Sequence, residues 1–84
     1  MEKEKLSQII DLAEKGDADA QYALGNCYMH GDGVEENWSI AFDWYLRSAK
    51  QGNAEAQSAV ADCYDFGFGV NSDLTAAYQW YLKA

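Results

Sequence analysis

The residue pair with the clearest chemical potential in this sequence is Cys27 and His30, which form a Cys-x-x-His motif. A thiolate and an imidazole at this spacing could begin a zinc site, or could act as a nucleophile and its base. The motif recurs only in part 36 residues later, because Cys63 is followed by Phe66 where the first copy has its histidine. Since both thiols are also expected to face the core, the sequence predicts no catalytic residue, no metal site and no cofactor.

Carboxylate pairs and glycine turns are the other patterns that could carry chemistry. Asp62 and Asp65 are spaced i, i+3 on one exposed side of a helix, and such pairs more often face solvent than act as acid and base. The two Gly-x-Gly motifs, at 31–33 and 67–69, resemble phosphate-binding loops only superficially, because each follows a helix rather than a strand. We therefore interpret these patterns as a solvated helix face and as turns.

These residues belong to a stretch that occurs twice. Residues 18–34 read ADAQYALGNCYMHGDGV, and residues 54–70 read AEAQSAVADCYDFGFGV. Apolar residues fall at helical spacing in each copy, and the glycines that follow can adopt the left-handed conformation that ends a helix. A unit that recurs after 36 residues is typical of a stacked array, in which each helix pair buries its apolar side against its neighbours.

The elements that position this stretch are predicted to be helices. Apolar spacing and capping residues predict helices over 3–15, 18–30, 38–50, 54–66 and 74–84. The predicted N-caps are Asp17, Asn37 (with Glu36 as the alternative), Asn53 and Asp73. We divide the chain into an N-terminal capping helix, residues 1–16, and two repeats, residues 17–52 and 53–84. Cys27 and Cys63 occupy equivalent places in successive repeats, roughly 8–10 Å or more apart, so we expect two free, buried thiols rather than a disulfide.

Composition argues against several classes of function. The 84 residues include 14 acidic and 6 basic side chains, which gives a formal net charge of −8. A field of this sign repels phosphate backbones, so we expect no nucleic-acid partner. No apolar run approaches the roughly 20 residues that cross a bilayer, and the charged residues at 2–5 are not followed by the apolar segment of a secretion signal. The sequence therefore predicts a soluble, cytoplasmic protein with no membrane partner.

The repeated unit resembles the Sel-one-like repeat, a relative of the tetratricopeptide repeat. The family pattern runs Ala-x-Ala-x-x-x-Leu-Gly-x-x-Tyr-x-x-Gly-x-Gly-Val, followed by Asp, Ala and Trp-Tyr. The two copies match it at Ala18, Ala20, Leu24, Gly25, Tyr28, Gly31, Gly33, Val34, Ala41, Trp44 and Tyr45, and at Ala54, Ala56, Tyr64, Gly67, Gly69, Val70, Asp73, Ala77, Trp80 and Tyr81. The resemblance implies an all-α, right-handed α/α solenoid: two antiparallel helix-pair repeats of about 36 residues plus the N-terminal helix, five helices in all.

The resemblance also implies a scaffold or adaptor that binds a protein or peptide, with the first helix of each repeat lining the concave side. The residues expected to line that side are Asp19, Tyr22, Asn26, Met29, His30, Glu55, Ser58, Asp62 and Asp65. Their carboxylates predict an acidic groove for a partner with basic or amide groups, and Tyr22 would be an amphipathic anchor. The same residues could instead form a solvated helix face.

Two alternatives stay open at this point. An acidic inhibitor- or immunity-type protein that blocks a basic partner through surface charge is a second candidate function, and its affinity would fall more steeply with salt. Two repeats are also fewer than the about three usually needed for a stable array, and no helix follows to cover Tyr81 and Leu82. We therefore expect either that the chain is part of a longer array or that its C-terminal helix associates with another molecule, such as a second copy.

Overall fold

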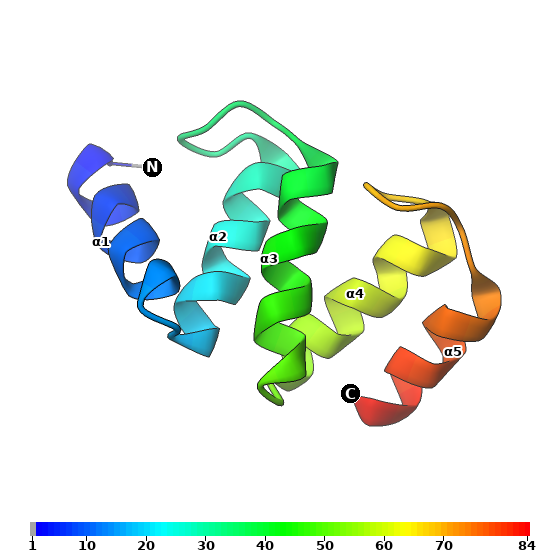
Figure 1. Cartoon of the computed structure of the whole chain (residues 1–84). Coiled ribbons are helices and arrows are strands. Elements are labelled where there is room, and N and C mark those ends of the chain that lie inside the picture. The colour runs from blue at the N-terminus through cyan, green and yellow to red at the C-terminus, as the bar shows by residue number, and fades with distance from the viewer. Residues whose placement is uncertain (1) are drawn as a thin grey trace.

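The computed structural model describes residues 2–84, and over this range the ordered elements are all helices. Five helices follow one another: α1 (Lys3–Glu14), α2 (Ala18–His30), α3 (Trp38–Lys50), α4 (Ala54–Phe66) and α5 (Leu74–Lys83). They form a single row in chain order, with α1 and α5 at opposite ends (Figure 1), in a molecule of 39 × 23 × 14 Å. This is the helix-pair solenoid that the sequence predicts, and the helix bounds agree with the prediction to within one residue. No helix in residues 2–84 is both long and apolar enough to span a bilayer.

Side-chain caps determine where α2 to α5 begin. In each case a side-chain oxygen accepts a hydrogen bond of 2.8 to 3.1 Å from the backbone N–H three residues later, and the capping residues are those predicted: Asp17, Asn37, Asn53 and Asp73. α2 and α4 end where Gly31 and Gly67 adopt the left-handed conformation, with φ of 67° and 75°. Because an N-cap contributes about 1 kcal/mol and a left-handed glycine ends a helix, local sequence alone accounts for these bounds.

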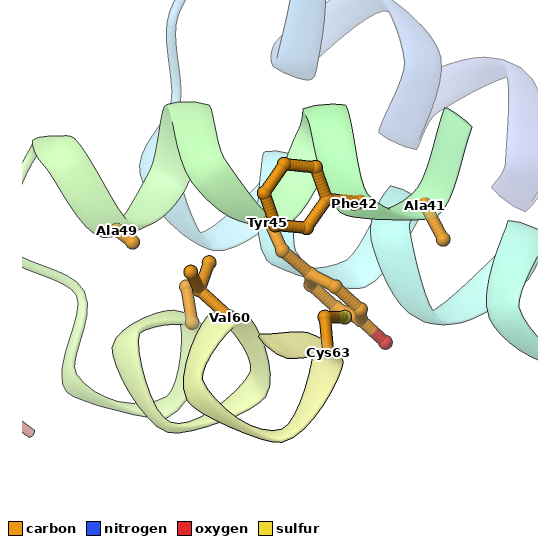
Figure 2. Close-up of a cluster of buried hydrophobic side chains, with 7 residues drawn as sticks. Ala41, Phe42, Tyr45, Ala49, Val60 and Cys63 are labelled. Carbon is orange, nitrogen blue, oxygen red and sulfur yellow. The ribbon is translucent and has the colours of Figure 1, made fainter. Parts of the chain in front are cut away.

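Two apolar clusters hold the row together. The first joins α1 to α2 and consists of Ala13, Ala20, Leu24 and Cys27. The second joins α3 to α4 and consists of Ala41, Phe42, Tyr45, Ala49, Ala56, Val60 and Cys63. Val60 and Cys63 point from α4 toward α3, where Tyr45 meets them (Figure 2). Tyr28 is half-buried and packs against both clusters, so the two repeats share one continuous core.

The glycine turn that follows α4 rests on the beginning of α3. Gly69 has a φ of +73°, and a Cβ atom at this position would lie 2.1 Å from the carbonyl oxygen of Trp38. Next to it, the ring of Phe68 packs on the ring of Trp38 with 4.7 Å between centroids. The turn of the second repeat is therefore a contact with the first repeat as well as the end of a helix.

Amide side chains connect the repeats at the other end of the helices, where the α1–α2 and α3–α4 turns lie (Figure 1). Nε2 of Gln51 donates to the Gly16 carbonyl oxygen at 2.9 Å and to Oε1 of Gln21 at 2.8 Å. Nδ2 of Asn53 donates to Oδ1 of Asp19 at 2.9 Å, while Oδ1 of Asn53 caps α4. These bonds fix the position of α4 relative to α2, the two helices expected to form the binding side.

Candidate functional site

A pocket of about 270 Å³ lies between α2 and α4. Its lining residues are Tyr22, Asn26, Met29, His30, Tyr45, Ala59, Asp62, Cys63 and Phe68. α2 and α4 supply most of them, whereas the buried Tyr45 comes from α3 and Phe68 from the second glycine turn. The pocket thus combines apolar and aromatic surface with an amide, an imidazole and a carboxylate, which is the usual mixture in a ligand site.

Five of the nine residues proposed from the sequence line this pocket: Tyr22, Asn26, Met29, His30 and Asp62. The other four are Asp19, Glu55, Ser58 and Asp65, which lie on the same two helices but outside the pocket. Asp19 has a structural contact instead, because its carboxylate accepts the hydrogen bond from Asn53. The pocket therefore lies over the middle and the C-terminal end of α2 and over the middle of α4, rather than along the full length of the two helices.

Sequence reasoning missed four lining residues: Tyr45, Ala59, Cys63 and Phe68. Helical spacing assigns Tyr45 and Cys63 to the core, and both are buried, but the pocket reaches down to them. Phe68 could have been found by comparing the repeats, because the residue between the two glycines is Asp32 in the first copy and Phe68 in the second. An acid replaced by an aromatic residue in a turn marks a site that differs in function or packing between the copies.

Two equivalent hydrogen bonds hold the polar residues of the pocket. The Tyr45 hydroxyl donates to Oδ1 of Asn26, and 36 residues later the Tyr81 hydroxyl donates to Oδ1 of Asp62, both at 2.5 Å. The bond to the carboxylate, followed by burial, raises the pKa of Tyr81 to about 12. Burial is the main cause that raises the pKa of Tyr45. Both phenols are therefore neutral donors near pH 7, and each fixes the orientation of the side chain that accepts its proton.

The cysteines are buried and are free thiols, as predicted. Burial raises the pKa of the Cys63 thiol to about 11, and it also raises the pKa of the Cys27 thiol. Cys27 belongs to the cluster between α1 and α2, whereas His30 is exposed and lines the pocket. Within residues 2–84 no three His, Cys, Asp or Glu side chains are grouped as metal ligands would be. The arrangement offers contact and hydrogen bonding to a ligand, not an activated nucleophile.

An exposed aromatic cluster extends the pocket at the second glycine turn. Phe68 lines the pocket, and its ring centroid lies 4.7 Å from that of Trp38. The same ring stacks on the ring of Phe66, with 5.4 Å between the centroids. Both Trp38 and Phe66 are exposed to solvent. Apolar surface therefore continues from the pocket onto the outside of the molecule, past the C-terminal end of α4.

The protein-family model of the Sel1 repeat matches residues 18–53 and 54–84, and each matched segment contains one helix pair. The chain belongs to the Sel1 repeat family. A crystal structure of a Sel1 repeat protein from Oxalobacter formigenes is similar to it, with 36% identity and a TM-score of 0.92. So is that of c5321, described as a protective antigen of uropathogenic Escherichia coli with an SLR fold, with 35% identity and a TM-score of 0.89. No curated protein matches the sequence.

The two similar structures cover 93% of this Sel1 repeat chain, which spans 60% of the first protein and 17% of the second. The family resemblance inferred from the glycine, alanine and tyrosine pattern is thereby confirmed. The Sel1 repeat is a non-catalytic scaffold fold, and proteins built from it generally bind other proteins. The chemistry of the pocket must indicate what kind of partner this chain would bind.

Proposed function

We propose that this Sel1 repeat protein is an interaction module that binds an extended segment of a partner polypeptide in the pocket between α2 and α4. The observation that carries the proposal is the composition of that pocket. Met29 and Phe68 supply apolar surface, while Asn26 and Asp62 supply hydrogen-bonding groups at equivalent places in the two repeats. A segment that places an apolar side chain in the pocket, between groups that bond to Asn26 and to Asp62, fits this arrangement.

The hydrogen bonds from the two tyrosines determine what Asn26 and Asp62 offer to such a segment. Tyr45 uses the carbonyl oxygen of the Asn26 side chain, which leaves the amide nitrogen with its two N–H donors for a ligand. Tyr81 uses one oxygen of Asp62 and leaves the second carboxylate oxygen as an acceptor. A peptide carbonyl therefore matches Asn26, whereas a lysine or arginine side chain matches Asp62.

The charge of the surrounding surface favours the same kind of partner. The chain has a formal net charge of −8, which attracts a cationic segment and raises its association rate. Asp19 and Glu55 are exposed in the first turns of α2 and α4, so carboxylates flank the pocket along both helices. The proposed site is an acidic groove for a basic segment with one apolar anchor.

Selection from a phage-displayed library of random peptides, followed by fluorescence polarisation with the enriched peptide, tests this function. We expect enriched peptides to carry a basic residue close to an apolar one. Asp62→Asn keeps the acceptor for Tyr81, as Asn26 does for Tyr45, but removes the charge, and we expect it to weaken binding about tenfold. Met29→Ala removes part of the apolar wall of the pocket and should weaken binding to a similar extent.

Glu55→Gln is the matched control, because it removes the same charge from an exposed position on α4 outside the pocket. A rim charge of this kind should change the affinity by less than about twofold at physiological salt. A library without enriched peptides, or a Glu55→Gln variant that loses as much affinity as Asp62→Asn, would contradict the pocket as the binding site.

The net charge of −8 also favours a second candidate, an acidic inhibitor- or immunity-type protein that covers a basic partner through overall charge. Ionic strength separates the two functions. Association through overall charge should weaken steeply between low and high salt, because exposed charges are screened beyond about 8 Å at physiological ionic strength. Binding anchored in the apolar pocket should retain most of its affinity, and only pocket binding should respond to Met29→Ala.

A further inference from the structure

The exposed aromatic cluster of Trp38, Phe66 and Phe68 lies beside the start of α3. Packing within the molecule accounts for only part of it, because Phe66 is 64% exposed and Trp38 is 42% exposed. α3 lies between α2 and α4, so Trp38 is accessible although both neighbouring helices are present (Figure 1). His30, which has in α2 the place that Phe66 has in α4, is exposed in the same way beside the second repeat. The cluster is therefore a surface that the stacked repeats leave open to a partner.

An open hollow of about 400 Å³ adjoins the cluster and contains a carboxylate. Its lining residues are Glu36, Asn37, Trp38, Ser39 and Gly69. The positive φ of Gly69 lets the second glycine turn approach the backbone of Trp38, and the neighbouring Phe68 packs on the indole ring. The hollow thus presents an aromatic ring and a carboxylate together, on backbone that both repeats hold in place.

The other two tryptophans of the chain already have a cation over their rings. The guanidinium carbon of Arg47 lies 4.5 Å from the ring centroid of Trp44. Nζ of Lys83 lies 4.6 Å from the ring centroid of Trp80. In both pairs the cation follows the tryptophan by three residues, whereas Trp38 has an alanine at that spacing. Since the flanking helices α2 and α4 contain no lysine or arginine, a cation at Trp38 would come from another molecule.

We propose that the exposed aromatic cluster and Glu36 together bind an arginine side chain of the partner segment whose apolar residue occupies the pocket. This inference rests on the proposed function, because the arginine belongs to the same bound segment. Phe68 provides the connection, since its ring lines the pocket and also contacts Trp38 and Phe66. A segment that leaves the pocket past Phe68 reaches the exposed cluster next.

Arginine fits this surface better than lysine or an apolar residue does. A guanidinium is planar, so it stacks on an aromatic ring and donates two parallel hydrogen bonds to a carboxylate, whereas an ammonium is a compact and strongly hydrated charge. Glu35 and Glu36 are exposed immediately before α3, which favours a positive side chain over an uncharged one. The basic residues of α3 itself, Arg47 and Lys50, lie in its last turn, at the opposite end of the helix from Trp38.

The second repeat has no equivalent of this site. Ser72 and Leu74 stand 36 residues after Glu36 and Trp38, so both the carboxylate and the indole are replaced. The site therefore occurs once in the two repeats, and a segment with one arginine has one register in which it can bind.

Parallel selections from one phage-displayed library of random peptides, on the wild-type protein and on Trp38→Leu, test this inference. Leu74 begins the equivalent helix of the second repeat, so we expect Trp38→Leu to keep its helix content in circular dichroism. From the wild type we expect peptides with an arginine at a constant spacing from the apolar residue, in addition to the basic residue near it. From Trp38→Leu we expect the same pair without enrichment of the arginine.

Fluorescence polarisation with the most enriched wild-type peptide then measures the coupling. Replacing its arginine by lysine should weaken binding about fivefold, and replacing it by alanine about tenfold. The alanine replacement should cost less than about twofold in Trp38→Leu, because the contact is already absent.

Glu36→Gln keeps all the aromatic rings and should weaken binding of the arginine peptide about threefold. Glu35→Gln is the matched control, because it removes the same charge from an exposed neighbour outside the hollow. It should change the affinity by less than about twofold. If Trp38→Leu has lowered helix content, the coupling to the arginine is measured with Glu36→Gln instead.

The possible outcomes separate this inference from the proposed function. Peptides that Met29→Ala weakens but that carry no arginine, or an apolar residue in its place, would overturn the arginine site and leave the pocket standing. So would an arginine whose replacement costs as much in Trp38→Leu as in the wild type. Equal losses from Glu35→Gln and Glu36→Gln would show attraction by overall charge instead of a site. A library without enriched peptides would overturn both proposals.

Discussion

Gly25 of α2 lies directly against the ring of Tyr45 in α3. A Cβ atom on Gly25 would be 2.6 Å from Cδ1 and 2.7 Å from Cε1 of that ring, closer than side-chain carbons approach. The ring has little room to move, because it is buried, packs against Tyr22 at 5.7 Å between centroids and donates its hydroxyl proton to Asn26. A glycine in mid-helix costs about 1 kcal/mol relative to alanine, and here the close packing of α2 on α3 offsets that cost.

Gly25→Ala should therefore destabilise the protein, although alanine is the better helix former. We expect the free energy of unfolding in urea to fall by about 1–3 kcal/mol, because the added methyl group overpacks the contact with Tyr45. Ala61 stands at the equivalent place in α4, where its methyl group is fully buried, so Ala61→Gly should also destabilise, by about 1 kcal/mol. A Gly25→Ala variant that is more stable than wild type would show that the contact between residue 25 and the Tyr45 ring accommodates a methyl group at little cost.

The helices of this protein could be predicted closely because their ends are encoded locally. Asp17 and Asn53 cap the helices that they precede, and Gly31 and Gly67 end those helices at the predicted places. The close approach of α3 at Gly25 could be inferred in the same local way, because a glycine in mid-helix lacks the Cβ atom that would keep a neighbouring helix away. The caps and the helix ends depend on residues within about one helix turn. Gly25 could be recognised because the equivalent position of the second repeat is not a glycine. The two copies within this one sequence were therefore enough to find these features.

The pocket was harder to predict because it depends on how two helices from different repeats face each other. Helical spacing placed Asn26 and Asp62 on the side of the helices where the pocket lies, but it could not show that Tyr45 and Tyr81 would fix their orientation. Nor could it show that Asp19 would be engaged by Asn53, because a hydrogen bond across 34 residues depends on the stacking of the repeats. Contacts between repeats therefore decided which proposed residues line the pocket.

The contact of Gly69 with Trp38 predicts a large difference between two glycine substitutions. Gly69→Ala should lower the free energy of unfolding by about 3 kcal/mol or more, because it forces an alanine into a positive φ and presses a methyl group against backbone atoms of α3. Gly52→Ala is the control, since Gly52 also has a positive φ, +99°, but no atom lies within 4 Å of its Cβ position. It should cost only about 1 kcal/mol, from backbone strain alone. Equal losses in urea denaturation would contradict the role of the turn as a contact between repeats.

Asn53 and Asp19 form a pair whose exchange can be tested without changing the net charge. Asn53→Asp keeps an equally good N-cap for α4 but replaces the amide that donates to Asp19 with a second carboxylate. We expect a loss of about 1 kcal/mol at low salt, from the broken bond and the repulsion between like charges, and a smaller loss at high salt. The double variant Asp19→Asn with Asn53→Asp should regain most of the stability in thermal denaturation. If the double variant is as unstable as Asn53→Asp, the pair does not hold the repeats together.

Burial of Cys63 predicts that stability falls in alkaline solution. The pKa of its thiol is about 11 in the folded protein, against an ordinary value of 9.0, so the folded state holds the proton more tightly than the unfolded state does. The resulting stabilisation is fully present below pH 9 and is lost as the pH rises toward 11. Between pH 8 and pH 10, in the presence of reductant, Cys63 should account for a decrease of about 1 kcal/mol in the free energy of unfolding. Cys63→Ala should be less stable than wild type at pH 8, because it leaves a small cavity, but should lose less stability between pH 8 and pH 10. Equal losses in the two proteins would show that other groups, such as Tyr81 with its pKa of about 12, cause the alkaline destabilisation.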